Sequence, residues 1–223
     1  NSIAQVTMRD IARQSEYTIS TIYKYFNSKE ELLFELLTAL MEGKSTWLFS
    51  VIDQVQEPLA KIYCYLQANF HWLKRFPAEL KLSHYVNSSE FKAENISDLA
   101  RHLQKGRRYK LYQYFEKIFQ DGRETGYFET DFDIPMTQDL MTITFKQVYY
   151  SIIILDHRNY DYFREYARLF LRSLVTPQKR GDIDQLITTE FELPLLPEEI
   201  LFDLNQSDQL ETEDTQPETD KKL

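Results

Sequence analysis

The 223-residue chain has one cysteine and only five glycines, which exclude an internal disulfide framework and argue against an all-β fold. Hydrophobic residues make up 43% of it, enough for a sizeable core, and the net charge of −9 comes entirely from residues 178–223, where thirteen acidic residues outnumber four basic ones. No apolar stretch could span a bilayer and no signal peptide opens the chain, so we expect a cytoplasmic protein with no membrane partner.

The N-terminal part predicts two short helices, separated by a tight turn and followed by a long helix. Thr7 and Asp10 have the spacing of a capping box, in which a hydroxyl accepts from a free backbone N–H and the carboxylate reaches back to the cap. Ser28 and Glu31 have the same spacing at the start of the long helix. Thr18 can cap the second short helix in the same way, and each cap contributes about 1 kcal/mol.

The second short helix has two distinct faces. Ile22 and Phe26, four residues apart, form its apolar face. Its other side chains are small, hydroxyl-bearing, aromatic or cationic, and none is a carboxylate: Ile19, Ser20, Thr21, Tyr23, Lys24 and Tyr25. This outward face can therefore enter a polyanionic groove without repulsion, where its hydroxyls and Lys24 can donate to phosphate.

The run T-x-R-D-I-A at residues 7–12, followed after a turn by T-I-Y-x-Y-F-x-S-K-E-E-L at residues 21–32, resembles the helix-turn-helix of the TetR family of bacterial transcription regulators. The resemblance implies that Thr7 and Arg9 lie at the groove edge and that residues 18–20 face the bases. It also places four residues from position 21 to 25 on the phosphate backbone or nearby bases, and Lys29 on phosphate. The DNA-binding residues implied by the resemblance are Thr7, Arg9, Thr18, Ile19, Ser20, Thr21, Tyr23, Lys24, Tyr25 and Lys29.

Two features depart from the family pattern. The family usually has glycine in the turn, where a positive φ costs little, and this chain has Glu16. The family also places a whole helix before the motif, whereas only residues 1–6 precede Thr7 here. We therefore expect a DNA-binding head that lacks its first helix.

The remaining pattern predicts an all-α protein in which a larger helical domain follows the head, and the family resemblance implies that this domain serves ligand binding and dimerisation. Apolar residues recur at spacings of three and four, and Pro58 and Pro135 suit the first turn of a helix. The predicted helices span residues 28–55, 58–76, 78–86, 90–121, 135–156 and 160–176, with a loop at 126–133.

The last two predicted helices are apolar or aromatic around most of their circumference. A helix that faces a single core needs only one apolar stripe, so these helices predict a partner, most simply a second copy in a four-helix interface. The family resemblance implies the same homodimer. The residues assigned to this interface are Phe145, Val148, Tyr149, Ile152, Ile153, Phe163, Tyr166, Phe170 and Leu174.

The predicted domains are residues 1–44 for DNA binding, 45–177 for regulation and dimerisation, and 178–223 for an acidic C-terminal extension. Residues 183–204 keep apolar side chains and could dock on the body or on a partner. From Asn205 onward, the composition predicts disorder.

No pattern predicts an enzyme, a cofactor or a metal site. The four histidines lack metal-ligand spacing, and no acid–base pair, nucleophile motif or glycine-rich phosphate loop is present. Cys64 fits a small core residue better than a redox sensor, and His71 could line a pocket or belong to a half-buried aromatic cluster. The basic cluster Lys105, Arg107, Arg108 and Lys110 fits a solvated helix face better than a site for an anion.

Together these patterns predict a homodimeric regulator that binds a palindromic operator in double-stranded DNA. We expect a repressor released by a small-molecule effector, which would bind among the helices of residues 58–150. The ligand-binding residues cannot be assigned from one sequence, because a pocket takes its lining from scattered helix positions. The alternative is a TetR-like interaction protein that has lost operator binding and acts through protein partners.

Overall fold

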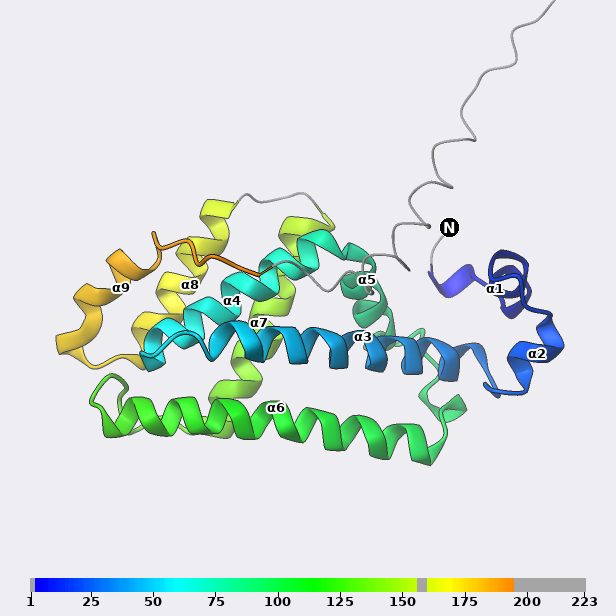
Figure 1. Cartoon of the computed structure of the whole chain (residues 1–223), viewed down its shortest axis with the longest axis horizontal. Coiled ribbons are helices and arrows are strands. Elements are labelled where there is room, and N and C mark those ends of the chain that lie inside the picture. Colours follow the sequence, from blue (N-terminus) through cyan, green and yellow to red (C-terminus); the bar gives the residue numbers. More distant parts are fainter. Residues whose placement is uncertain (1–2, 156–159, 195–223) are drawn as a thin grey trace, which may run out of the picture. The chain divides into compact units, whose positions relative to one another are not determined.

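The computed structural model describes residues 3–155 and 160–194, and these residues are helical without any extended sheet, which confirms the predicted all-α fold. The chain divides into two compact units, Asn1–Glu192 and Leu193–Leu223, and the helices belong to the first. The helices are α1 (Met8–Gln14), α2 (Ile19–Tyr23), α3 (Lys29–Ile52), α4 (Pro58–Arg75), α5 (Pro77–Val86), α6 (Asp98–Glu124), α7 (Ile134–Ile153), α8 (Tyr160–Leu174) and α9 (Arg180–Leu186) (Figure 1). Three short 3-10 turns accompany them: η1 (Ile3–Gln5), η2 (Ala93–Asn95) and η3 (Pro177–Lys179).

The long helix α3 connects the N-terminal head, formed by α1 and α2, to the helical body (Figure 1). It continues through Gly43 without a break. Near its N-terminus, Leu33, Phe34 and Leu37 are buried against residues of α5 and of the segment that follows it. The start of α3, which follows the head, is therefore fixed to the body by packed side chains.

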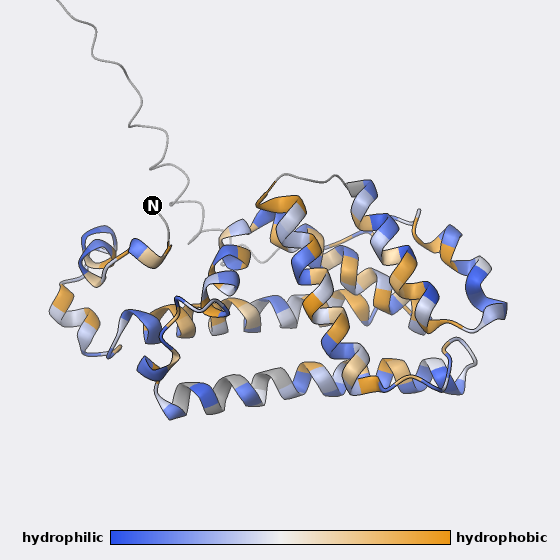
Figure 2. Ribbon diagram, turned by 180° about the vertical axis from the view of Figure 1, so that it is seen from behind, coloured by the Kyte–Doolittle hydropathy of each residue, from blue (hydrophilic) through white to orange (hydrophobic). Residues whose placement is uncertain are grey.

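The body is built around α4, which packs against α3, α5, α6, α7 and α8. Ile62, Cys64 and Leu66 on this helix have no exposed surface, and Tyr63 is equally buried. Figure 2 shows the contrast between α6, which is largely hydrophilic, and α7, where hydrophobic residues recur. Burial on all sides explains why the apolar pattern of α4 is nearly continuous.

The start of α6 differs from the prediction. The sequence predicts a helix from residue 90, but α6 begins at Asp98, and residues 90–97 form an irregular segment that includes η2. In this segment Phe91 and Ile96 are buried in the cluster around Leu33 and Phe34. The apolar side chains that suggested a helix instead anchor a connection that crosses to the base of the head.

The connection between α6 and α7 is fixed to the end of α8. The backbone N–H of Glu129 donates to Leu174 O over 2.8 Å, and that of Thr176 donates to Tyr127 O over 3.0 Å. The Phe128 ring, which is 1% exposed, lies against Gly122, where an added Cβ would overlap it. A side chain at position 122 would therefore displace this ring from the core.

The first part of the C-terminal extension packs on the body. Ile183 of α9 has no exposed surface, and Tyr63 Oη donates to Ile187 O over 2.9 Å. The amide of Gln67 holds the following backbone at two points, because its Nε2 donates to Thr189 O and its Oε1 accepts from the Phe191 N–H. Of the two docking alternatives, residues 183–191 therefore take the body. The prediction of disorder from residue 205 onward falls outside the described residues.

Candidate nucleic-acid interface and ligand pocket

The caps predicted for the head are present. Thr7 Oγ1 accepts from Asp10 N over 3.2 Å while the Asp10 carboxylate accepts from Thr7 N over 3.0 Å, which completes the predicted capping box. Thr18 Oγ1 accepts from Thr21 N over 3.1 Å. Because these bonds satisfy backbone groups at the first turns, they fix where α1 and α2 begin.

At the start of α3, only one of the two hydrogen bonds of the predicted capping box is present. Ser28 Oγ accepts from Glu31 N over 3.0 Å, as predicted. The Glu31 carboxylate, however, accepts from the backbone N–H and the side-chain amide of Asn27, each over 2.8 Å, and no bond to the Ser28 N–H is recorded. The bonds from Asn27 lower the pKa of Glu31, although its burial opposes them. Glu31 therefore ties the end of the head to the start of α3.

The outward face formed by residues 19–25 is free of carboxylates, as the sequence predicts. Eight of the ten predicted DNA-binding residues are exposed, and Thr21 and Lys29 are half-buried. Tyr23 and Tyr25 retain exposed fractions of 51% and 77%, which is unusual for aromatic side chains without a partner. These residues lie together on one end of the protein and can donate hydrogen bonds to a polyanion.

Glu16 occupies the turn between α1 and α2 with φ of +59°. It is the one non-glycine residue with positive φ in the described chain, so the expected backbone conformation at this position is confirmed. A side chain in this region costs about 1–2 kcal/mol relative to the right-handed region. The turn therefore carries strain, and it places a negative charge beside the predicted DNA-binding face.

Lys29 is held by the protein itself. Its Nζ donates to Ala4 O over 2.9 Å and lies 5.6 Å from the centroid of the Tyr85 ring on α5. The predicted phosphate contact would have to replace this bond. Lys24, by contrast, is exposed and has no recorded partner among the described residues.

The comparisons with known proteins agree with this geometry. Residues 1–36 match the model of bacterial regulatory proteins of the tetR family, and several structural relatives carry the same family name. These matches support the TetR family for this chain.

Its relatives in the family are distant. The transcriptional repressor KstR2 of Mycobacterium tuberculosis is 24% identical over 135 residues, which cover 58% of this chain and 62% of KstR2. The chain thus matches about three fifths of the length of that relative. FadR of Bacillus subtilis, solved in complex with stearoyl-CoA, has a TM-score of 0.60 and 19% identity over 79% of this chain and 90% of FadR, and KstR2 itself has a TM-score of 0.55.

The residues predicted for dimerisation lie mostly inside the protomer. Six of the nine are buried there: Phe145, Val148, Tyr149, Ile152, Phe163 and Leu174. Ile153, Tyr166 and Phe170 are half-buried. Phe145 contacts the rings of both Tyr166 and Phe170. These contacts join α7 to α8, so the six buried side chains leave little surface for a partner, and the interface itself stays a prediction.

Other apolar residues on the same two helices are exposed. Along α7 they follow helical spacing and have exposed fractions of 63%, 51% and 65%: Met136, Leu140 and Ile143. On α8 they are Tyr162 and Leu169, at 38% and 61%. The sequence did not separate this stripe from the core face, because both faces are apolar.

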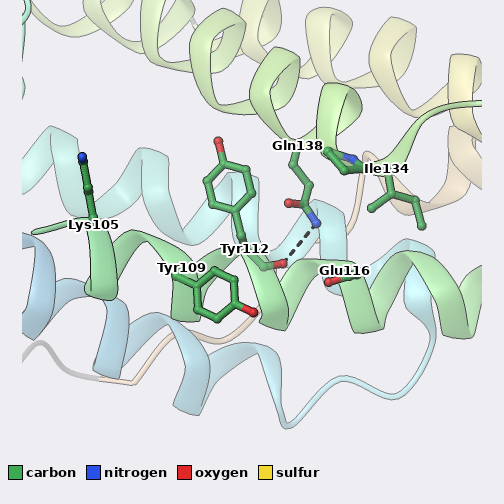
Figure 3. A pocket seen from close by; sticks show the side chains of 7 residues that line it. Lys105, Tyr109, Tyr112, Glu116, Ile134 and Gln138 are labelled. Carbon is green, nitrogen blue, oxygen red and sulfur yellow. Dashed lines mark hydrogen bonds between the residues drawn. The ribbon is translucent and has the colours of Figure 1, made fainter. Parts of the chain in front are cut away.

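A pocket of about 400 Å³ lies between α6 and the start of α7 (Figure 3). Seven residues line it: Lys105, Tyr109, Tyr112, Glu116, Ile134, Pro135 and Gln138. Tyr112 Oη donates to Asp139 Oδ1, and Gln138 Nε2 donates to Tyr112 O over 3.1 Å. Lys105 belongs to the predicted basic cluster, whereas the sequence gave no signal for the other six lining residues.

Polar side chains continue from this pocket into the core. Burial raises the pKa of Tyr65 to about 12, a hydrogen bond with Asn69 opposes this effect, and the charge of Glu79 adds to it. The Tyr65 ring lies 4.5 Å from that of Phe115 on α6. Glu79 is bound by Lys44 and by Trp72 Nε1, at 2.6 Å for the latter. Next to them, Trp47 Nε1 is buried and has no hydrogen-bond partner among the described residues. Nothing in the sequence indicated this interior ion pair.

His71 and Cys64 have no visible part in either site. Burial lowers the pKa of His71, whose ring lies 6.2 Å from that of Phe70, which fits the aromatic-cluster alternative. Cys64 is buried, and this burial raises the pKa of its thiol to about 12. The described residues contain no cluster that could hold a metal ion and no helix long and apolar enough to cross a membrane.

Proposed function

We propose that this protein is a DNA-binding transcription regulator of TetR type that acts as a repressor. The observation that carries the proposal is the carboxylate-free outward face of residues 19–25, where Tyr23, Lys24 and Tyr25 are exposed at the end of a helix with a defined start. Hydroxyl and ammonium donors on such a surface suit phosphate contacts, and the N-terminal residues of α2 suit base contacts in the major groove.

We propose that the regulator is a homodimer formed through the outer faces of α7 and α8. The exposed stripe of Met136, Leu140 and Ile143 needs cover, because an apolar patch of this kind on a helix pair marks an interaction site. A twofold axis through this face would present two heads to a palindromic operator, with half-sites about 34–36 Å apart or a multiple of that distance.

We propose further that a small-molecule effector releases the protein from its operator. The structural relative FadR was solved with stearoyl-CoA, which supports an effector of moderate size in this type of helical body. The effector must bind the two states of the head with different affinity, and it cannot shift their populations by more than that difference.

Two observations favour the alternative, an interaction protein that has lost operator binding. Glu16 adds a negative charge beside the DNA-binding face, and Lys29 is engaged within the protein. If this alternative holds, the head would serve as a packing element and the dimer face would contact protein partners.

A gel-shift experiment with the DNA upstream of the protein's own gene, at two salt concentrations, separates the two. A regulator gives saturable, sequence-dependent retention that weakens as salt increases, because phosphate contacts release counterions. Random DNA of the same length is the control. Equal retention of both DNAs, or none of either, contradicts operator binding and supports the alternative.

A further inference from the structure

The pocket between α6 and α7 has an apolar middle. Of its lining residues, Tyr109 and Tyr112 come from α6, while Ile134 and Pro135 come from the start of α7 (Figure 3). A volume of about 400 Å³ is within the range of small-molecule sites. Rings and aliphatic groups on both walls favour a ligand with an apolar body.

The two ends of the pocket carry opposite charges. Lys105 and Glu116 are separated by three turns of α6, about 16 Å along its axis. Lys105 is exposed and forms no ion pair with any described residue, so its ammonium is available to a ligand. An anionic group is favoured at the Lys105 end and disfavoured at the Glu116 end. A ligand with one anionic group would therefore bind in a single orientation.

Gln138 supplies a hydrogen-bond acceptor near the middle. The residue is 4% exposed, and its Nε2 donates to Tyr112 O. Its carbonyl oxygen accepts no hydrogen bond from the described residues and points toward Tyr112 in Figure 3. An amide oxygen that lines a pocket can accept a hydrogen bond from a ligand hydroxyl or N–H.

We infer that this pocket binds an amphipathic carboxylic acid that carries a hydroxyl or amide N–H on its apolar body. The carboxylate lies at Lys105, the apolar chain lies between Tyr112 and Ile134, and the donor group bonds to Gln138 Oε1. We identify this ligand with the effector of the proposed repressor, and this identification rests on the proposed function.

The position of the pocket fits a regulatory site. Its residues Tyr112 and Gln138 join α6 to α7, the helix proposed for dimerisation. The ring of Tyr65 on α4 lies 4.5 Å from that of Phe115 on α6, and α4 packs in turn against α3, the helix that carries the head. A ligand that moves α6 against α7 can therefore favour one arrangement of these packed helices over another.

Calorimetric titration of the full chain with 10-hydroxydecanoate tests the inference. Its length places the hydroxyl near Gln138 when the carboxylate is at Lys105, because seven residues of helix separate Lys105 from Tyr112, about 10 Å. Decanoate lacks the hydroxyl, and decyltrimethylammonium replaces the anion with a cation. We expect saturable binding of one hydroxy acid per protomer, decanoate about fivefold weaker, and the cation weakest.

Three variants locate the site. Lys105→Glu should lower the affinity for the hydroxy acid by about fivefold, because it reverses the charge at this end of the pocket. Lys110→Glu should not change the affinity, because Lys110 is exposed on the same helix and does not line the pocket. Gln138→Leu should remove the preference of the hydroxy acid over decanoate. Circular dichroism checks that each variant is folded, and Lys105→Glu remains informative if Gln138→Leu is not.

The inference is overturned if the cation binds best, if Lys105→Glu and Lys110→Glu behave alike, or if none of the three compounds binds saturably below its micellar concentration. Because the titration contains no DNA, a failure of operator binding in the gel shift leaves its result intact. Binding of the acid without any effect on operator retention would confirm the pocket and contradict its role as an effector site.

Discussion

The ammonium of Lys44 on α3 donates to Oε1 of Glu79 on α5, and the side chains of this ion pair keep exposed fractions of only 12% and 3%. The other oxygen of Glu79 accepts from Trp72 Nε1 on α4. One carboxylate thus connects three helices. Removing one partner of a buried pair leaves an uncompensated charge, so we expect Lys44→Met to lower the free energy of unfolding by about 3 kcal/mol.

Urea denaturation followed by circular dichroism measures this effect. Lys81→Met, at an exposed position of α5, is the matched control and should change the free energy of unfolding by less than about 0.5 kcal/mol. The double variant Lys44→Met/Glu79→Gln should recover part of the loss, because it removes both charges. Equal effects of Lys44→Met and Lys81→Met would contradict a buried ion pair.

Replacing Glu16 by glycine should stabilise the head. The backbone keeps its φ of +59°, glycine adopts this region without the steric cost, and the greater flexibility of unfolded glycine offsets part of the gain. We expect Glu16→Gly to raise the free energy of unfolding by about 0.5–1 kcal/mol. Glu16→Ala removes the charge and keeps the strain, so it should give no such gain. A Glu16→Gly variant less stable than the wild type would show that the turn is not strained.

Acid should weaken the protein partly through Glu31. The hydrogen bonds from Asn27 hold the pKa of this carboxyl below its ordinary value of 4.5 in the folded state. Its contribution to stability is therefore complete above pH 4.5 and is lost as the pH falls through the lower folded-state value. We expect the urea midpoint of Glu31→Gln to fall less than that of the wild type between pH 7 and pH 3.

Some loss on acidification remains in Glu31→Gln, because hydrogen bonds from Thr7 also lower the pKa of Asp10. At pH 7 the variant should be less stable than the wild type, since an amide accepts more weakly from Asn27 than a carboxylate does. Parallel losses of wild type and variant throughout this pH range would exclude the assigned role of Glu31.

Lys24 and Lys29 should differ in their contribution to DNA binding. Lys24 is exposed, and each phosphate it neutralises adds about 0.9 to the slope of log affinity against log salt. We expect Lys24→Ala to reduce this slope by about one unit per head. Lys29→Ala should leave it unchanged, because Lys29 is bonded to Ala4 O. A slope reduced equally by both changes would show that Lys29 leaves Ala4 when DNA binds.

Ile143→Arg should produce monomers without unfolding the protomer. Its side chain is 65% exposed, so arginine fits in the isolated protomer and is disfavoured only in an apolar interface. Analytical ultracentrifugation measures the change, with Leu36→Arg as the control at an exposed leucine of α3. Phe145→Ala should instead cost about 3–5 kcal/mol through a core cavity. Dimers that persist in Ile143→Arg would move the interface elsewhere.

Local features of the sequence predicted much of this fold. Thr7 and Thr18 fix helix starts through bonds to residues three positions away, and such bonds can be predicted from spacing alone. The pairing of Lys44 with Glu79 joins residues 35 positions apart, and no local pattern reports it. For the same reason the apolar circumference of α7 predicted a partner but did not separate Phe145, which faces the core, from Ile143, which faces solvent.

The close contact between Gly122 and Phe128 has a mechanical consequence. Since the Phe128 ring holds the α6–α7 connection beside Leu174 and Val175, the two proposed dimerisation helices are clamped together at this end. If α8 rotates against α7, this end of the pair would stay fixed and the far ends of the helices would move the most. Gly122→Ala, which forces the ring out, would release the fixed end and let both ends move.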